Sequence, residues 1–162
     1  MQTQCNGFFL ETALMRRPFY IVPLLLVLSA CSHRVDTSVS PEFLSPNGPS
    51  ANPFSPAVRV GNLLFLAGQI GTNASGQLVS GGLQAEVRQT LNNISEVLQK
   101  TGSSLDKVVK CTVFMADMKE WAAMNEIYAT YFRNHKPARS SFGTTGLAMN
   151  ARVEIECIAV VN

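Results

Sequence analysis

The residue types best suited to chemistry lie in the last predicted strand, which runs from residue 151 to 161. Alternation divides its side chains between a charged face and an apolar face. The charged face holds Arg152, Glu154 and Glu156, and the apolar face holds Val153, Ile155, Cys157 and Ala159. Carboxylates in such a strand form either an ordinary solvated face or an acid–base site in a partly dry cleft. The pattern alone favours the solvated face and leaves a catalytic carboxylate open.

Residues that would bind a metal or a cofactor are scarce. The histidines, His33 and His135, lie far apart, with no cysteine or carboxylate at ligand spacing, whereas a zinc site normally takes three or four ligands. No glycine-rich phosphate loop follows a predicted strand. A net charge of +2 is too small for a nucleic-acid-binding surface. We therefore expect no metal, no cofactor and no nucleic-acid partner.

The front of the chain has the layout of an export signal. Arg16-Arg17 precedes an apolar run over residues 19–28, which is far shorter than the ~20 residues that span a bilayer. Leu28-Ser29-Ala30-Cys31 follows directly and resembles the lipobox of bacterial lipoproteins, in which Cys31 would be lipidated. Ser32 after the cysteine favours the outer membrane. We expect an exported, periplasm-facing lipoprotein; a buried apolar helix that happens to end in a cysteine is the alternative.

These features divide the chain into four parts. Residues 1–14 are expected to be an upstream extension, residues 15–30 a lipoprotein signal peptide, and residues 31–53 the lipidated cysteine with a flexible linker. The linker is rich in Pro and Ser and has no hydrophobic periodicity, although a loop packed on the domain near Phe43-Leu44 is also open. Residues 54–162 are expected to fold as one domain.

Hydrophobic periodicity within this domain predicts strands and helices in the order ββ-α-β-α-ββ. Two strands flank Gly61-Asn62 within residues 58–66, and three more are expected at 107–115, 140–144 and 151–161. Apolar steps of three and four predict a helix over 83–100 that ends near Gly102, and a capping box at Asp117 opens another that runs to about Arg133. The fold class is therefore an α/β (α+β) sandwich, one mostly antiparallel sheet with two helices on one face. The uncovered face predicts an oligomer.

Short motifs from Phe54 to the end of the chain resemble the RidA (YjgF-type) family of reactive-intermediate enamine/imine deaminases. They are Ser55-Pro56-Ala57-Val58, Val60-Gly61-Asn62, Ala67-Gly68-Gln69-Ile70, Gly102-Ser103-Ser104-Leu105, Val108-Val109-Lys110, Asn125-Glu126-Ile127-Tyr128, Pro137-Ala138-Arg139-Ser140 and Val153-Glu154-Ile155-Glu156. The resemblance implies a chorismate-mutase-like homotrimer with active sites between neighbouring subunits. It also implies a cofactor-free hydrolase that converts 2-enamine and 2-imine acids, such as 2-aminoacrylate and 2-iminobutanoate, to 2-keto acids and ammonia.

The same resemblance assigns roles to four residues. Arg139 matches the family's substrate-binding arginine, whose planar guanidinium can hold a carboxylate with two hydrogen bonds. Glu154 matches the carboxylate that positions or activates the attacking water. Asn125 matches an asparagine of the cleft, and Ser141 stands where many relatives carry Cys and can contact substrate through its backbone. A structural ion pair at Arg139 and a helix-surface amide at Asn125 are the alternatives.

Two pocket positions depart from the family pattern. Phe54 stands where relatives often have Tyr, and Ala67 where a Ser often lines the pocket. Each change removes a hydroxyl, and a lost hydrogen bond costs about 1 kcal/mol or more. A non-catalytic trimeric carboxylate-binding module tethered to the membrane is therefore the alternative function. RNA cleavage ranks last, because the sequence offers neither a histidine-based acid–base pair nor a basic patch.

Cys111 and Cys157 both fall in predicted strands among apolar neighbours. An oxidising periplasm would allow them to pair. Because cysteine is common in protein cores, we expect buried free thiols.

Overall fold

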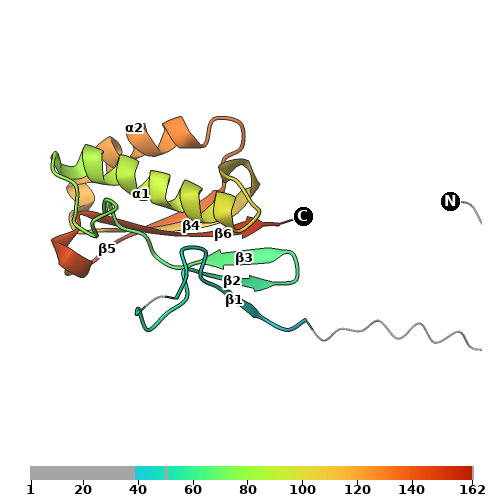
Figure 1. Cartoon of the computed structure of the whole chain (residues 1–162). Helices are drawn as coiled ribbons and strands as arrows, with labels where there is room; N and C mark the ends of the chain where they lie inside the picture. Colours follow the sequence, from blue (N-terminus) through green and yellow to red (C-terminus); the bar gives the residue numbers. More distant parts are fainter. Residues whose placement is uncertain (1–38, 50, 162) are drawn as a thin grey trace, which may run out of the picture. The chain divides into compact units, whose positions relative to one another are not determined.

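The computed structural model describes residues 39–49 and 51–161, which belong to the compact unit Thr37–Asn162 (Figure 1). Cys31, the expected signal peptide and most of the expected linker lie outside the described residues. The described part forms one six-stranded sheet with two α-helices. None of its helices is both long enough and apolar enough to cross a bilayer.

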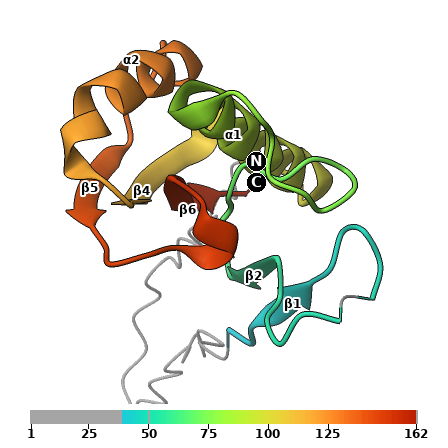
Figure 2. The same ribbon diagram turned by 90° about the vertical axis from the view of Figure 1, so that its left-hand side faces the viewer.

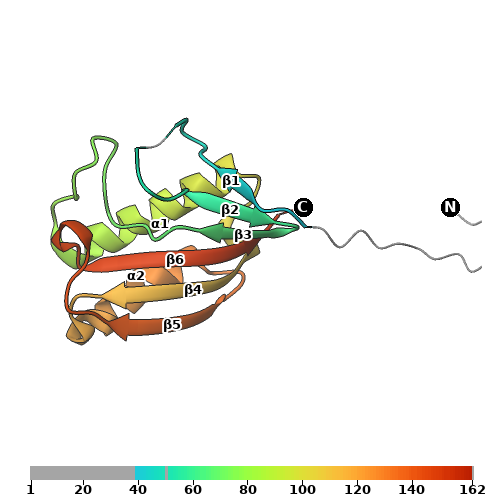
Figure 3. The same ribbon diagram turned by 90° about the horizontal axis from the view of Figure 1, so that it is seen from below.

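The strands lie side by side in the order β1-β2-β3-β6-β4-β5 (Figure 3). Their bounds are β1 (Glu42–Leu44), β2 (Ala57–Val60), β3 (Leu63–Leu66), β4 (Val108–Met115), β5 (Ala138–Gly143) and β6 (Val153–Val160). Every neighbouring pair is antiparallel except β4 and β5, which run parallel. The expectation of a mostly antiparallel sheet is confirmed.

Helices α1 (Gly82–Lys100) and α2 (Trp121–Tyr131) lie together on one face of the sheet, as expected (Figures 1 and 2). The apolar stripe of α1 is buried against the strands through Leu83, Val87, Leu91, Ile94 and Leu98. The helix ends where the sequence predicts. Gly102 takes a left-handed φ of 82°, and the Ser103 amide donates to the Leu98 carbonyl at 2.8 Å.

The second helix begins later than the sequence predicts. Asp117 accepts a hydrogen bond from the Lys119 amide at 2.9 Å. This cap opens a 3₁₀ turn, Met118–Glu120, and helix α2 begins only after it, at Trp121. Glu120 would reach back to Asp117 in a complete capping box. Its carboxylate instead accepts from Arg152 Nε at 3.1 Å. The capping box is therefore only half formed.

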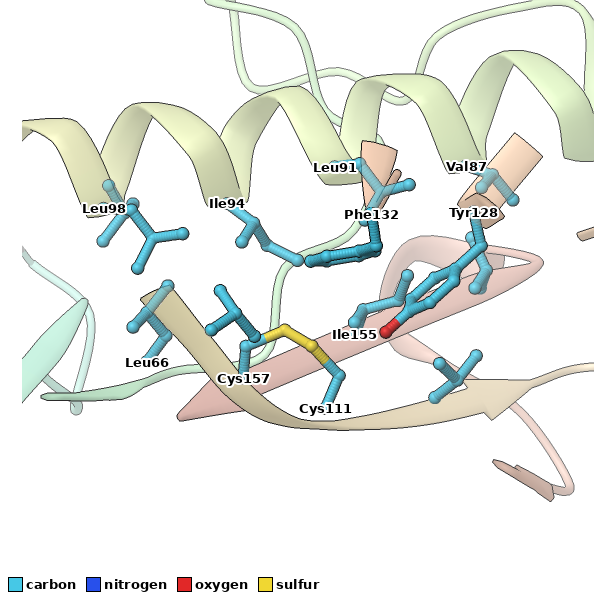
Figure 4. Packing of buried hydrophobic residues seen from close by; sticks show 14 of the residues in the cluster. Leu66, Val87, Leu91, Ile94, Leu98, Cys111, Tyr128, Phe132, Ile155 and Cys157 are labelled. Atoms are coloured by element: carbon cyan, nitrogen blue, oxygen red, sulfur yellow. A yellow bond between two sulfur atoms is a disulfide. The ribbon is translucent and has the colours of Figure 1, made fainter. Parts of the chain in front are cut away.

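The core between helices and sheet contains a disulfide, and the expectation of free thiols at Cys111 and Cys157 is wrong (Figure 4). The two cysteines face each other on the antiparallel strands β4 and β6, with Cα atoms 4.1 Å apart. Directly opposite residues in such a pair lie close enough for their sulfurs to bond. The sequence conceals this register because the cysteines are 46 residues apart.

Strand β1 lies within the segment expected to be a linker. It pairs antiparallel with β2, and Leu44 packs against the core cluster while Phe43 is 69% exposed. A loop packed on the domain near Phe43-Leu44 was the alternative prediction for this segment. Three residues close to prolines are too few to show a strand period.

No described helix covers the opposite face of the sheet, which Figure 3 views directly. This open face includes Phe65, which is 40% exposed, and the ring pair Phe114 and Phe142, whose centroids are 6.3 Å apart. Exposed aromatic side chains on an uncovered sheet face are common at interfaces. They support the expectation of an oligomer, which remains a prediction.

Candidate active site

Arg139 lies on β5 with its side chain under α2. It pairs in register with the buried Cys111, which places it on the helix-covered side of the sheet. Its guanidinium carbon lies 4.6 Å from the ring centre of Tyr128 and 5.8 Å from that of Trp121. These distances are typical of cation–π contacts. The aromatic rings thus hold the guanidinium without consuming its N–H donors.

Within the described residues, Arg139 has no carboxylate partner. The ion pairs found there are Lys100–Glu96 and Arg152–Glu120, so the alternative of a structural ion pair within the chain has no support. A guanidinium with free donors is suited to a bidentate contact with a ligand carboxylate.

A groove of about 370 Å³ runs beside Arg139, between α2 and the start of β5. Tyr128, Phe132 and Pro137 supply apolar walls, and Asn125 and Lys136 add polar groups. Asn125 reaches the groove because it lies four residues after Trp121 and three before Tyr128, on the same helix face. The volume and mixed lining fit a small organic anion.

Tyr128 supports Arg139 through its ring rather than its hydroxyl. The hydroxyl oxygen is buried, has no hydrogen-bond partner in the described part of the chain, and points toward the sheet in Figure 4. Burial raises the pKa of Tyr128 to about 12, although the positive charge of Arg139 opposes this shift. The phenol therefore stays neutral at physiological pH.

Ser141 shares the side of β5 that holds Arg139. It pairs in register with the buried Val113 and is itself half-buried. Asn125, Arg139 and Ser141, three of the residues singled out by the sequence, thus lie on the helix-covered side of the sheet. We call this set the arginine group.

Glu154 lies on β6 with its side chain toward the open face. It is opposite Phe114, while its neighbours Val153 and Ile155 point into the core. Burial raises the pKa of the Glu154 carboxyl, and the nearby carboxylate of Glu156 raises it further. A carboxylate whose pKa is raised in this way is a better general base at neutral pH.

Gly68 forms the wall against which the Glu154 carboxylate rests. A Cβ at position 68 would overlap Glu154 Oε1, so no other residue fits without moving the carboxylate. Two hydrogen bonds of 2.9 Å between the backbones of Gln69 and Ile155 hold this wall against β6. Sequence reasoning missed Gly68 as a site residue, although it stands within the motif Ala67-Gly68-Gln69-Ile70.

The two departures from the family pattern lie in the chain segments next to Gly68. Ala67 precedes Gly68, and its amide donates to the Pro56 carbonyl at 3.0 Å. That bond ties the wall to the loop that carries Phe54, which is 54% exposed. We call Phe54, Ala67, Gly68 and Glu154 the glutamate group.

Arg139 of the arginine group and Glu154 of the glutamate group lie on opposite faces of one sheet. Strand β4 also separates β5, which carries Arg139, from β6, which carries Glu154. One small molecule therefore cannot contact both residues within a single chain. Within one chain, the residues that the family resemblance assigns to the site thus fall into two separate groups, which we call half-sites.

A six-stranded sheet backed by two helices, with Arg139 on the covered face and the half-buried Glu154 on the open face, defines a small α+β domain. The chain belongs to the family whose model is described as Endoribonuclease L-PSP, which matches residues 46–161. It is similar to the 2-iminobutanoate/2-iminopropanoate deaminase of Mus musculus, with 45% identity over 109 residues that cover 67% of this chain and 81% of the relative. The Homo sapiens protein of the same name is 42% identical over 109 residues, 67% of this chain and 80% of that protein.

Solved structures show the same fold. The yeast protein YEO7 matches with a TM-score of 0.71 and 38% identity, covering 76% of this chain and all of that one. The YjgF gene product of E. coli matches with a TM-score of 0.67 and 31% identity, covering 74% and 98% of the two chains. The expected RidA-like fold and membership of the RidA (YjgF-type) family are confirmed.

Proposed function

We propose that this protein hydrolyses 2-enamine and 2-imine acids to 2-keto acids and ammonia. The observation that carries the proposal is the guanidinium of Arg139, held by two aromatic rings beside a groove, with no carboxylate partner among the described residues. Relatives that are 42–45% identical bear the name 2-iminobutanoate/2-iminopropanoate deaminase. Hydrolysis of a 2-imino acid in this chain would use a cationic anchor for the substrate carboxylate and a base that activates water.

The two groups of residues have separate tasks in this reaction. Arg139 donates two hydrogen bonds to the substrate carboxylate while the enamine tautomerises to the imine by gaining a proton on carbon. Water then adds to the imine carbon as Glu154 takes one of its protons, which gives a carbinolamine. The C–N bond breaks as the nitrogen gains a proton, and the carbonyl forms. One water is consumed and one ammonia is released.

Two copies of the chain would form each site, the arginine group of one facing the glutamate group of the other. The opposite placement of Arg139 and Glu154 and the exposed aromatic side chains of the open face both support this arrangement. A homotrimer allows this arrangement in a closed ring. At each subunit boundary, one chain contributes its arginine group and its neighbour contributes its glutamate group.

The reaction itself can be tested with the purified full-length protein. 2-Aminoacrylate and 2-iminobutanoate are generated in situ, and the release of ammonia and keto acid is followed against buffer. We expect Arg139→Ala to lose about a hundredfold or more in rate, because truncation removes a charged anchor. Arg133→Ala, a change at an exposed arginine outside the groove, should keep full activity. Equal rates for the wild type and buffer would reject the deaminase function.

The shared site makes a separate prediction about mixed assemblies. Arg139→Ala and Glu154→Gln should each be inactive alone. Mixed and co-refolded in equal amounts, they should regain about one quarter of wild-type activity by random assortment, since only a site built from the two intact halves works. If mixing restores nothing while mixed oligomers form, Arg139 and Glu154 do not act across a subunit boundary.

A second candidate function is carboxylate binding without chemistry. Phe54 and Ala67 favour it because both lack the hydroxyls common at these positions in the family. Calorimetry with a 2-keto acid distinguishes the two functions. Binding that requires Arg139, combined with no ammonia release, would establish the binding module.

We further propose that the chain is an outer-membrane lipoprotein anchored through Cys31. The lipobox motif supports this location, and so does the Cys111–Cys157 disulfide, because such bonds persist mainly in oxidising compartments. The wild type should enter the detergent phase and the outer-membrane fraction of a bacterial host, whereas Cys31→Ser should remain in the aqueous phase. Equal partition of the two proteins would reject lipidation at Cys31.

A further inference from the structure

Two cations, Arg139 and Lys136, line the groove beside α2. The described lining contains no Asp or Glu, and neither cation takes part in an ion pair within the described residues. A single substrate carboxylate satisfies only Arg139. A monocarboxylic substrate therefore leaves the Lys136 ammonium without an anionic partner.

The spacing of the two cations suits a second carboxylate on the same ligand. Lys136 stands three residues before Arg139, just ahead of β5, and it also lines a second hollow that contains Asp106. Both side chains are long, and both border the same groove. Their heads can therefore approach a molecule that lies between them. The groove volume of about 370 Å³ leaves room for a chain longer than that of 2-iminobutanoate.

We propose that the preferred substrates are dicarboxylic 2-imino acids, the imines that correspond to aspartate and glutamate. This inference rests on the proposed deaminase function. The forked guanidinium of Arg139 takes the carboxylate next to the imine, and the ammonium of Lys136, a compact point charge, takes the distal carboxylate. Tyr128 and Pro137 provide the apolar wall for the methylene groups between them.

The contribution of Lys136 is modest because its side chain is exposed. Exposed ion pairs contribute about 0.2–1 kcal/mol, which corresponds to roughly a 1.4- to fivefold effect on kcat/KM. Salt screens such a pair. The dicarboxylate preference should therefore shrink as ionic strength rises.

The test compares kcat/KM of the full-length protein for four imines made in situ by amino-acid oxidases. They derive from aspartate, glutamate, 2-aminobutyrate and phenylalanine. We expect the dicarboxylates to be preferred at low salt. Lys136→Gln should lower the ratio of dicarboxylate to 2-iminobutanoate turnover by roughly 1.4- to fivefold. Lys119→Gln removes an exposed charge outside the groove and should leave the ratio unchanged.

Two results would overturn the inference and leave the deaminase function intact. One is an unchanged ratio in Lys136→Gln, and the other is a preference for the phenylalanine imine, which would show that the apolar walls select the substrate. No turnover of any imine would reject the deaminase function instead. In that case, calorimetry with 2-oxoglutarate decides: weaker binding by Lys136→Gln supports the dicarboxylate site, and equal binding overturns it.

Discussion

Loss of the Cys111–Cys157 disulfide should cause a large decrease in stability. The bond closes a loop between cysteines 46 residues apart. Chain-entropy arithmetic for a loop of that length gives about 4 kcal/mol at 25 °C. The free energy of unfolding of a whole domain is about 5–15 kcal/mol. A single bond in the core therefore accounts for a large share of the margin that keeps the domain folded.

Urea unfolding at one fixed protein concentration measures this effect. The oxidised wild type is compared with protein that has been reduced in denaturant and refolded with reductant present. Cys111→Ala/Cys157→Ala is the matched variant, and its stability should not respond to reductant. The wild type and the double variant should also titrate equal numbers of free thiols when denatured without reductant. Two additional thiols in the wild type, or equal stability of its oxidised and reduced forms, would refute the reasoning.

Three further predictions concern the two half-sites. Gly68→Ala should reduce kcat strongly with little change in the urea midpoint, because the added Cβ displaces the Glu154 carboxylate; unchanged kcat would contradict this. Tyr128→Phe should raise the free energy of unfolding by about 1 kcal/mol and keep activity, since it removes a buried hydroxyl without a partner; a loss of stability would reveal a partner. The acid limb of the kcat/KM profile should lie above pH 4.5, because burial raises the pKa of Glu154, and Glu156→Gln should shift this limb to lower pH. The same raised pKa means that Glu154 contributes stability below pH 4.5 that is lost as pH rises through its folded-state pKa. Glu154→Gln should therefore be more stable than the wild type at neutral pH by urea unfolding, and an acid limb at the ordinary pH for Glu would contradict the assignment.

Local patterns were enough to predict most elements of this fold. The apolar stripe of α1 buries the side chains that the sequence assigned to it, and Gly102 ends the helix. Alternation in β6 likewise separates the buried Ile155 from the half-buried Glu154. These features depend on neighbours a few residues away, which the sequence displays directly.

Long-range pairing was not predictable in the same way. The Cys111–Cys157 bond depends on the register between β4 and β6, and no local pattern records it. The separation of Arg139 from Glu154 depends on β5 lying parallel to β4 at the sheet edge. The sequence identified both residues through family resemblance but could not show that they lie on opposite faces.

The two lost hydroxyls of the family pattern belong to one half-site, while Ser141 in the other stands where many relatives carry Cys. Phe54 and Ala67 both belong to the glutamate group, whereas the arginine group keeps Asn125 and an Arg139 held by aromatic rings. On the glutamate side, burial raises the pKa of the Glu154 carboxyl and the neighbouring Glu156 carboxylate raises it further. In this chain, we expect changed substrate preference to arise from the groove beside Arg139 and changed pH dependence to arise from the surroundings of Glu154.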